Sequence, residues 1–216
     1  MRGILIRVLA AALLVIGAVE VLRAQEVVDR IVARVENDII LLSDLRELSL
    51  YQQLVDGKSE SDAAILDRLI DQWVVRTEAD TAHFPNPTEA EIERGLERLR
   101  KSFATPEEYE ARKKKLGLSD TEIKAMVEAQ LYLSNYLDSR FRPSVQVDSK
   151  AIEEFYQNGV VPRAKARGQE PPSLDAARDY IQEALIQKGI NEQADRWLKE
   201  SRSRLHVEQF MDEGAK

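Results

Sequence analysis

The sequence predicts a mainly α-helical protein with one small β-sheet. Apolar residues recur at a spacing of three to four through most of the chain, as they do in amphipathic helices. Near the N-terminus, residues 31–45 read IVARVENDIILLSDL, which is typical of two short strands, a turn and the start of a helix. Near the C-terminus, residues 205–210 (LHVEQF) alternate as in a strand.

The first predicted elements are a hairpin and a helix. Residues 31–35 alternate with the period of two that suits a half-buried strand. The triplet Glu-Asn-Asp at 36–38 is predicted to form the turn, because Asn and Asp tolerate a positive φ. Apolar residues return at 39–42, and Ser43 followed by Asp44 predicts a helix N-cap with an acid in the first turn.

Four helices are predicted in the middle of the chain, each with a start or stop signal. The first covers residues 61–84 and ends at the PNP of residues 85–87, because proline cannot continue a helix. The next three start at a capping box (Thr88 with Glu91), at a proline in the first turn (Thr105-Pro106) and at a second capping box (Ser119 with Glu122).

The helix predicted from Ser119 to Phe141 has two unlike faces. At 100° per residue, Met126 lies on an apolar stripe, whereas Tyr132 and Tyr136 lie together on the opposite side. Two interpretations stay open: a second helix covers the tyrosines, or they form an exposed aromatic ridge that contacts a partner.

The remaining third of the chain is predicted to be less regular at first. Residues 143–147 suggest a short strand, and Ser149 the cap of a short helix. The composition of residues 159–173 (GVVPRAKARGQEPPS) predicts a mobile loop or linker. A long helix then starts at Ser173, and we expect Gly189 to bend it.

The strand at residues 205–210 is predicted to pair with the N-terminal hairpin. A lone strand would leave its backbone groups unpaired, and a lone hairpin is marginal in water. Pairing solves both problems, so the C-terminal helix and strand would return to complete the N-terminal core. An open edge of that sheet is a risk for unwanted pairing, or a site where a bound polypeptide can add a strand.

Residues 1–24 are predicted to be a signal peptide. Arg2 and Arg7 precede an apolar run from Val8 to Val19. A helix of this length spans roughly 18 Å, whereas a bilayer core is about 30 Å thick. The run therefore suits a signal-peptide core, with cleavage after Ala24. An uncleaved membrane anchor stays open, because Leu22 is large for the position three residues before the cleaved bond.

Composition excludes several classes of function. The formal charge of −7 argues against a protein that binds nucleic acid by neutralising phosphates. The absence of cysteine excludes disulfides, thiolate metal sites and cysteine nucleophiles. Neither His83 nor His206 has the spacing of a zinc motif, and no P-loop, GxSxG or GxGxxG occurs. We therefore expect no metal and no cofactor.

Three stretches resemble the chaperone domain of the SurA family of periplasmic chaperones for outer-membrane proteins. They are VVDRIVARVENDIILLSDL, the segment LIDQWVV (Leu69–Val75) and ADRWLKESRSRLHVEQF. The resemblance covers most of residues 26–142 and about 174–210, and related helical domains occur in trigger factor and exported parvulin-type proteins. It implies a SurA-like core in which the C-terminal helix and strand return to the hairpin.

The chain departs from that family in one respect. SurA-like proteins commonly carry parvulin prolyl-isomerase domains between the two blocks. Only about 30 residues separate Arg142 from Ser173, fewer than the roughly 50 that a small domain needs. No glycine-rich stretch typical of a parvulin domain occurs either. We therefore expect the chain not to be an enzyme and to lack isomerase activity.

The predicted organisation has five parts: a signal peptide (1–24), the N-terminal part of the core (25–142), a short replacement for a parvulin domain (143–173), the closing helix and strand (174–210) and a tail (211–216). The resemblance implies an exported, ATP-independent holdase that binds unfolded apolar or aromatic segments, with outer-membrane proteins as clients. Candidate client-binding residues are Tyr51, Met126, Tyr132, Tyr136 and Tyr156.

Three alternatives stay open beside this hypothesis. The protein could be a chaperone tethered to the inner membrane by an uncleaved anchor, an assembly subunit with one dedicated partner, or an isomerase-related protein without activity. The membrane would be a partner only through the uncleaved segment. A dimer is compatible with all of them.

Overall fold

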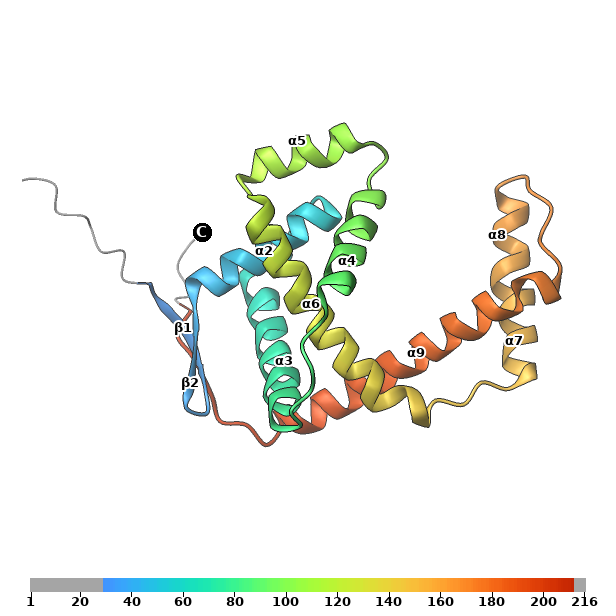
Figure 1. The fold of residues 1–216 in the computed structure, drawn as a ribbon. Helices are drawn as coiled ribbons and strands as arrows, with labels where there is room; N and C mark the ends of the chain where they lie inside the picture. Colours follow the sequence, from blue (N-terminus) through green and yellow to red (C-terminus); the bar gives the residue numbers. More distant parts are fainter. Residues whose placement is uncertain (1–28, 212–216) are drawn as a thin grey trace, which may run out of the picture. The chain divides into compact units, whose positions relative to one another are not determined.

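The computed structural model of the protein describes residues 29–211. Residues 31–211 belong to one compact unit, and Asp29 and Arg30, the two described residues before it, belong to another. The predicted signal peptide and tail residues 212–216 lie outside the described residues. The prediction of a mainly helical protein with a small sheet is confirmed (Figure 1).

The elements of the larger unit follow in chain order (Figure 1). The first are β1 (Ile31–Val35), β2 (Asp38–Leu41), α2 (Leu42–Asp56) and α3 (Asp62–Thr81). The middle of the chain holds α4 (Glu89–Lys101), α5 (Pro106–Leu116) and α6 (Asp120–Phe141). A 3-10 turn (Arg142–Ser144) leads to α7 (Ser149–Phe155), a π-helical turn (Tyr156–Val160), α8 (Val161–Ala166), α9 (Leu174–Arg202) and β3 (Val207–Gln209).

The sheet has the strand order β2-β1-β3, and both pairs are antiparallel. The predicted return of the C-terminal strand to the hairpin is thus confirmed. The N–H of Glu36 donates to the carbonyl of His206 at 2.9 Å, and the N–H of Phe210 donates to the carbonyl of Val32 at 2.8 Å. The two ends of the described chain therefore share one sheet.

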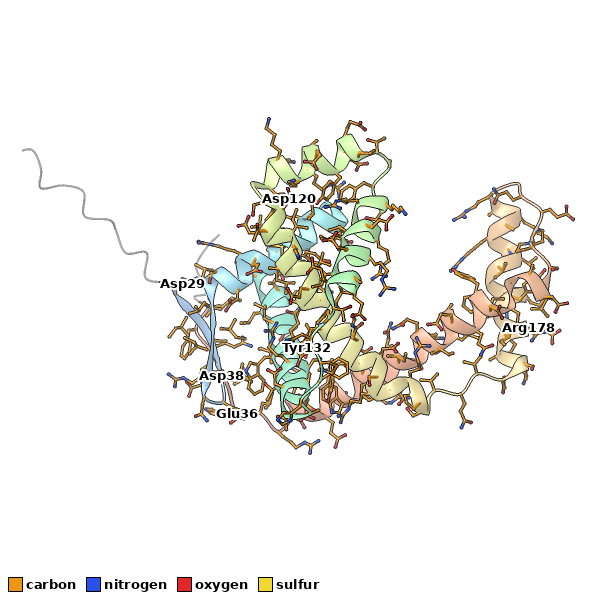
Figure 2. All side chains as sticks on the ribbon, in the orientation of Figure 1. Asp29, Glu36, Asp38, Asp120, Tyr132 and Arg178 are labelled. Atoms are coloured by element: carbon orange, nitrogen blue, oxygen red, sulfur yellow. The ribbon has the colours of Figure 1, made fainter. Side chains whose placement is uncertain are left out.

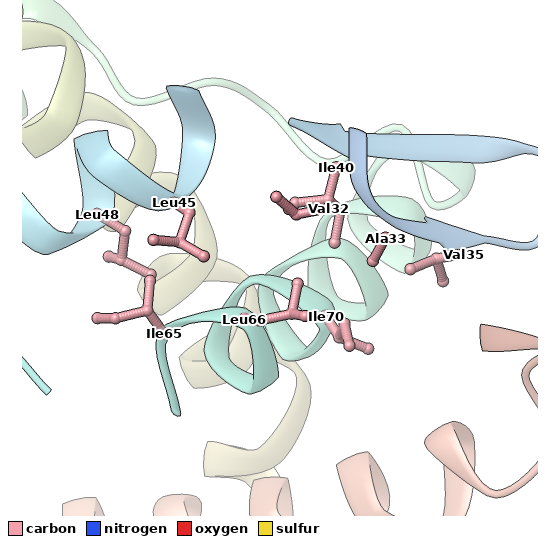
Figure 3. Close-up of a cluster of buried hydrophobic side chains, with 9 residues drawn as sticks. All are labelled: Val32, Ala33, Val35, Ile40, Leu45, Leu48, Ile65, Leu66 and Ile70. Atoms are coloured by element: carbon pink, nitrogen blue, oxygen red, sulfur yellow. The ribbon is translucent and has the colours of Figure 1, made fainter. Parts of the chain in front are cut away.

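One face of the sheet packs on α2 and α3, as the close-up of the core shows (Figure 3). Val32 and Val35 of β1 are fully buried, as are Leu66 and Ile70 of α3. Side chains from β3 and its flanks complete this cluster from the C-terminal end: Leu205, Val207 and Met211. This core fixes the position of β2 beside the two helices.

The long helix α9 joins two clusters of buried side chains. Its C-terminal half contributes Trp197 and Leu198 to a cluster with α3 and α6, whereas Ala177 and Ile181 pack against α7. Gly189 lies between these halves, and a Cβ there would lie 2.6 Å from a methyl of Val145. The helix continues through this position. Glycine is needed there because any side chain would collide with Val145.

The N-cap predictions are confirmed for some helices and wrong for α2. Thr88 and Ser119 cap their helices as predicted, and α5 has the predicted proline in its first turn, with Thr105 as its cap. The prediction that Ser43 caps α2 is wrong: the helix starts at Leu42, and the carboxylate of Asp44 accepts the N–H of Leu41 at 2.8 Å.

Two further boundaries shift because of side-chain hydrogen bonding and turn geometry. Asp148, not Ser149, caps α7, since its carboxylate accepts the N–H of Ala151 at 2.7 Å. In the hairpin turn, Glu36 takes the positive φ of 53°, a role expected of Asn or Asp. Its backbone N–H donates to the carbonyl of His206 in the flank of β3, so a tertiary hydrogen bond stabilises this conformation.

Two predictions for residues 143–173 are wrong. The strand expected at 143–147 is absent; Pro143 lies in the 3-10 turn, and Val147 packs against the cluster of α7 and α9. The loop expected at 159–173 is helical up to Ala166 and irregular only from 167 to 173. Pro162 is compatible with α8 because it lies in the first turn, where no backbone donor is required.

Candidate functional site

A groove lies beside β2, between α2, α3 and α6. We call it the β2 groove; its cavity volume is about 290 Å³. Its apolar lining comes from β2, α2, α3 and α6: Ile39, Ile40, Leu48, Leu69, Trp73 and Met126. The volume is near the lower end of small-molecule pockets, about 300–1,000 Å³, so it suits one or two large side chains.

The walls of the β2 groove carry polar side chains. Gln72 and Gln130 are half-buried, and their amides form no side-chain hydrogen bond within residues 29–211. Glu47 on α2 and Arg76 on α3 are exposed, and neither forms an ion pair with another described residue. The groove thus combines an apolar floor with unpaired polar groups at its sides.

Trp73 fixes the geometry of this groove. Its indole N–H donates to the carboxylate of Asp38 at 2.9 Å, which ties α3 to the start of β2. The ring is half-buried and packs against the main core. Part of the Trp73 ring therefore belongs to the core, and the rest lines the groove.

The structure brings two of the five predicted client-binding residues together. Met126 is buried and lines the β2 groove from α6, and Tyr51 lines it from α2. Burial raises the pKa of the Tyr51 hydroxyl, and the nearby carboxylate of Asp56 raises it further. Tyr51 therefore stays neutral and offers a hydroxyl and an aromatic edge.

Tyr132 and Tyr136 lie elsewhere, and the interpretation of a covered face is confirmed. They are 8% and 5% exposed, so an exposed aromatic ridge is excluded. Figure 2 shows Tyr132 on α6 beside α3. The Tyr132 hydroxyl donates to Asp80 on α3 at 2.6 Å, which together with burial raises its pKa to about 12. Tyr136 packs edge-on against Phe84. Both tyrosines hold α3, α6 and the chain after α3 together.

Tyr156 belongs to a third region. It packs in the cluster of α7 and α9, and its hydroxyl donates to the carbonyl of Pro172 at 2.7 Å. This bond fastens the segment before α9 to the π-helical turn. Tyr156 does not line the β2 groove.

Two other hollows share walls with the β2 groove. A hollow of about 400 Å³ between α2, α4 and α6 also has Tyr51 and Gln130 in its lining. A hollow of about 460 Å³ beside α9 also has Trp73 in its lining. An aromatic ring is thus shared between the β2 groove and each neighbouring hollow: Tyr51 on one side and Trp73 on the other.

Sequence reasoning missed most residues of this site. Ile39 is 49% exposed although it stands in an apolar run, and only the run itself gave a signal. Gln72 and Gln130 are ordinary helix residues in the sequence. Their joint position depends on the packing of α3 against α6, which no local pattern reveals.

The described residues show no other candidate centre. Among residues 29–211, no group of three or more His, Asp or Glu side chains could hold a metal ion. In the same part of the chain, no helix has both the length and the apolar character needed to cross a membrane. No protein-family description matches the chain, and no curated protein is significantly similar to it.

Proposed function

We propose that the protein is an exported, ATP-independent holdase that binds unfolded apolar or aromatic segments of client proteins. The observation that carries this proposal is the β2 groove, with its apolar floor, its unpaired amides and the exposed Ile39 at its margin. The resemblance to SurA-like chaperones supports the proposal and points to outer-membrane proteins as the client class and to the periplasm as the compartment.

The dimensions of the site favour weak, reversible binding. A client aromatic side chain buries about 150–250 Å². At about 25 cal/mol per Å², its burial gains roughly 4–6 kcal/mol. Association itself costs about 4–15 kcal/mol in lost motion and ordering. One side chain in the groove therefore gives little net affinity, as a chaperone that must release its clients requires.

The two neighbouring hollows explain how affinity could be raised for long clients. An extended chain rises about 3.3 Å per residue, so side chains of one segment reach successive hollows without any folding of the client. Each added contact brings more apolar burial at a smaller entropic cost, because the segment is already held. Release follows when the client folds or passes to another protein, without nucleotide hydrolysis.

Aggregation of unfolded clients tests the proposal. Several unrelated outer-membrane proteins are diluted from urea with and without the purified protein, and light scattering is followed. We expect suppression at near-stoichiometric amounts with each client and no effect of ATP. Suppression of a single client only would favour the assembly subunit with one dedicated partner, and no suppression of any client would remove the holdase proposal.

The first residue of the mature protein tests the proposed compartment. We expect N-terminal sequencing of the protein purified from its native host to start at Gln25 or close to it, with the protein released by osmotic shock. An intact N-terminus that stays with the membrane fraction would instead support the tethered alternative.

A further inference from the structure

We propose that the open edge of β2 binds a client segment as an added β-strand, with a large apolar side chain in the β2 groove and a Lys or Arg close to Glu47. The occupant is an extended stretch of unfolded polypeptide. This inference rests on the proposed holdase function and adds the binding mode and the preferred client sequence.

The ladder of the described strands shows which backbone groups point away from the sheet at this edge. The carbonyl of Val32 and the N–H of Glu36 bond to β3, so alternate residues of β1 face β3. Arg34, which lies between them, also faces β3, and it pairs with Ile39 on β2. Since antiparallel pairs alternate between bonded and non-bonded, the N–H and C=O of Ile39 point away from β1.

The edge of β2 is short, but it lacks two residue types that proteins use to block strand addition. Its sequence, Asp-Ile-Ile-Leu, contains no Lys or Pro, and Ile39 is 49% exposed. The opposite edge, at β3, is different, because Glu208 there pairs with Arg34 at 3.2 Å and with His206 at 3.1 Å. The exposed Ile39 therefore leaves the β2 edge accessible to an added strand.

Strand geometry connects the open edge to the groove. In a bonded pair at Ile39, the client residue places its side chain on the same face as the Ile39 side chain. Its two neighbours project to the other face, where Ile40 is buried beside α3. Ile40, Leu69 and Trp73 line the β2 groove, so one neighbour has an apolar cavity to enter.

The polar walls define the client further. The unpaired amides of Gln72 and Gln130 each offer a donor and an acceptor, which match a peptide backbone. Asp44 and Glu47 carry two negative charges on α2, against one positive charge at Arg76. The carboxylate of Asp44 is already used by the Leu41 N–H, so Glu47 is the group available to a cation.

The free donor and acceptor at Ile39 identify the class of occupant. A lipid chain or a helix would bury these groups without a partner, which costs free energy. An extended peptide satisfies both and fills the groove in the same step. A second copy of this chain, paired edge to edge through β2, is the competing occupant that the experiment separates.

The experiment uses the purified full chain and a labelled soluble peptide in which phenylalanine alternates with threonine between lysines. A matched peptide carries N-methyl groups on alternate residues, which removes backbone donors but keeps the side chains. We expect N-methylation to weaken binding about tenfold, which equals about 1.4 kcal/mol. Replacement of the lysines by glutamates should weaken it at least as much at low salt.

Variants of Ile39 provide the test from the side of the protein. Ile39→Pro removes the N–H that points away from β1, and edge strands tolerate proline. Ile39→Val keeps that N–H and is the control. We expect Ile39→Pro to bind the lysine peptide about tenfold more weakly and Ile39→Val to bind it normally, with circular dichroism spectra alike for all three proteins.

The outcomes separate this inference from the holdase proposal. Equal binding of the plain and N-methylated peptides would overturn strand addition even if Ile39→Pro does not fold. If suppression of client aggregation persists in that case, the holdase proposal stands and only the binding mode is wrong. A concentration-dependent dimer that Ile39→Pro abolishes, in sedimentation of the protein alone, would assign the edge to a second copy and contradict the inference.

Discussion

Removal of β3 should destabilise the whole unit, because this strand closes the core formed by β1 and α3. A chain that stops after Arg204 loses the backbone bonds from Glu36 to His206 and from Phe210 to Val32. It also loses three half-buried side chains that pack on the main core: Leu205, Val207 and Met211.

The size of the loss follows from these contacts. A fully buried side chain of this size contributes about 1.5–3 kcal/mol, so three half-buried ones contribute roughly 3 kcal/mol. The two backbone bonds add about 1 kcal/mol each. The total of roughly 5 kcal/mol is a large part of the 5–15 kcal/mol by which a typical domain is stable.

Urea unfolding, followed by circular dichroism, measures this difference. The matched control stops after Met211 and keeps β3 with its flanking residues. We expect the control to unfold within about 0.5 kcal/mol of the full chain, and the chain that stops after Arg204 to lose roughly 5 kcal/mol of unfolding free energy. Equal unfolding midpoints for the two truncated chains would refute the reasoning that β3 is part of the core.

Two other predictions concern packing and pH. Gly189→Ala should destabilise the protein by about 1–3 kcal/mol although alanine favours helices, because its Cβ would lie 2.6 Å from Val145. The double variant with Val145→Ala should recover part of this loss in thermal unfolding, and a gain in stability from Gly189→Ala alone would contradict the close packing. Tyr132→Phe should cost about 1.5 kcal/mol, since it removes a hydrogen bond to the charged Asp80. Because the pKa of Tyr132 is raised to about 12 in the folded protein, its contribution is present below pH 10 and is lost as the pH rises from 10 to 12. Unfolding free energies of the wild type and Tyr132→Phe should therefore converge over that range, and a constant difference would show that the bond to Asp80 is not responsible.

Much of the fold was predictable because its determinants are local. Thr88 and Ser119 are each followed three residues later by a glutamate, a pattern that predicts a helix start, and the structure forms both capping boxes. The β1–β3 pairing was also predictable, since a lone strand and a lone hairpin each need a partner. Where a tertiary contact overrides local preference, as at Glu36 in the turn, the sequence predicted the wrong residue.

The candidate site was harder to predict because it depends on distances between elements. Helical periodicity placed Tyr132 and Tyr136 on one side of α6 but gave no information about what covers that side. Met126 and Tyr51 were selected individually, and only the packing of α2 and α6 against α3 places them in one groove with Trp73. Gly159 and Pro162 suggested a loop, although the backbone there continues as a π-helical turn and α8.

The most direct measurement of client binding in the β2 groove compares two aromatic variants in the aggregation assay. Trp73→Ala removes the ring shared by two hollows, whereas Tyr156→Ala removes a half-buried ring from the separate α7 cluster. Ile39→Asp, at an exposed position of the groove, serves as a second groove variant with little effect on the core. We predict that both groove variants need several-fold more protein to suppress client aggregation, whereas Tyr156→Ala behaves as the wild type. Full suppression by folded Trp73→Ala and Ile39→Asp would contradict a client site in this groove.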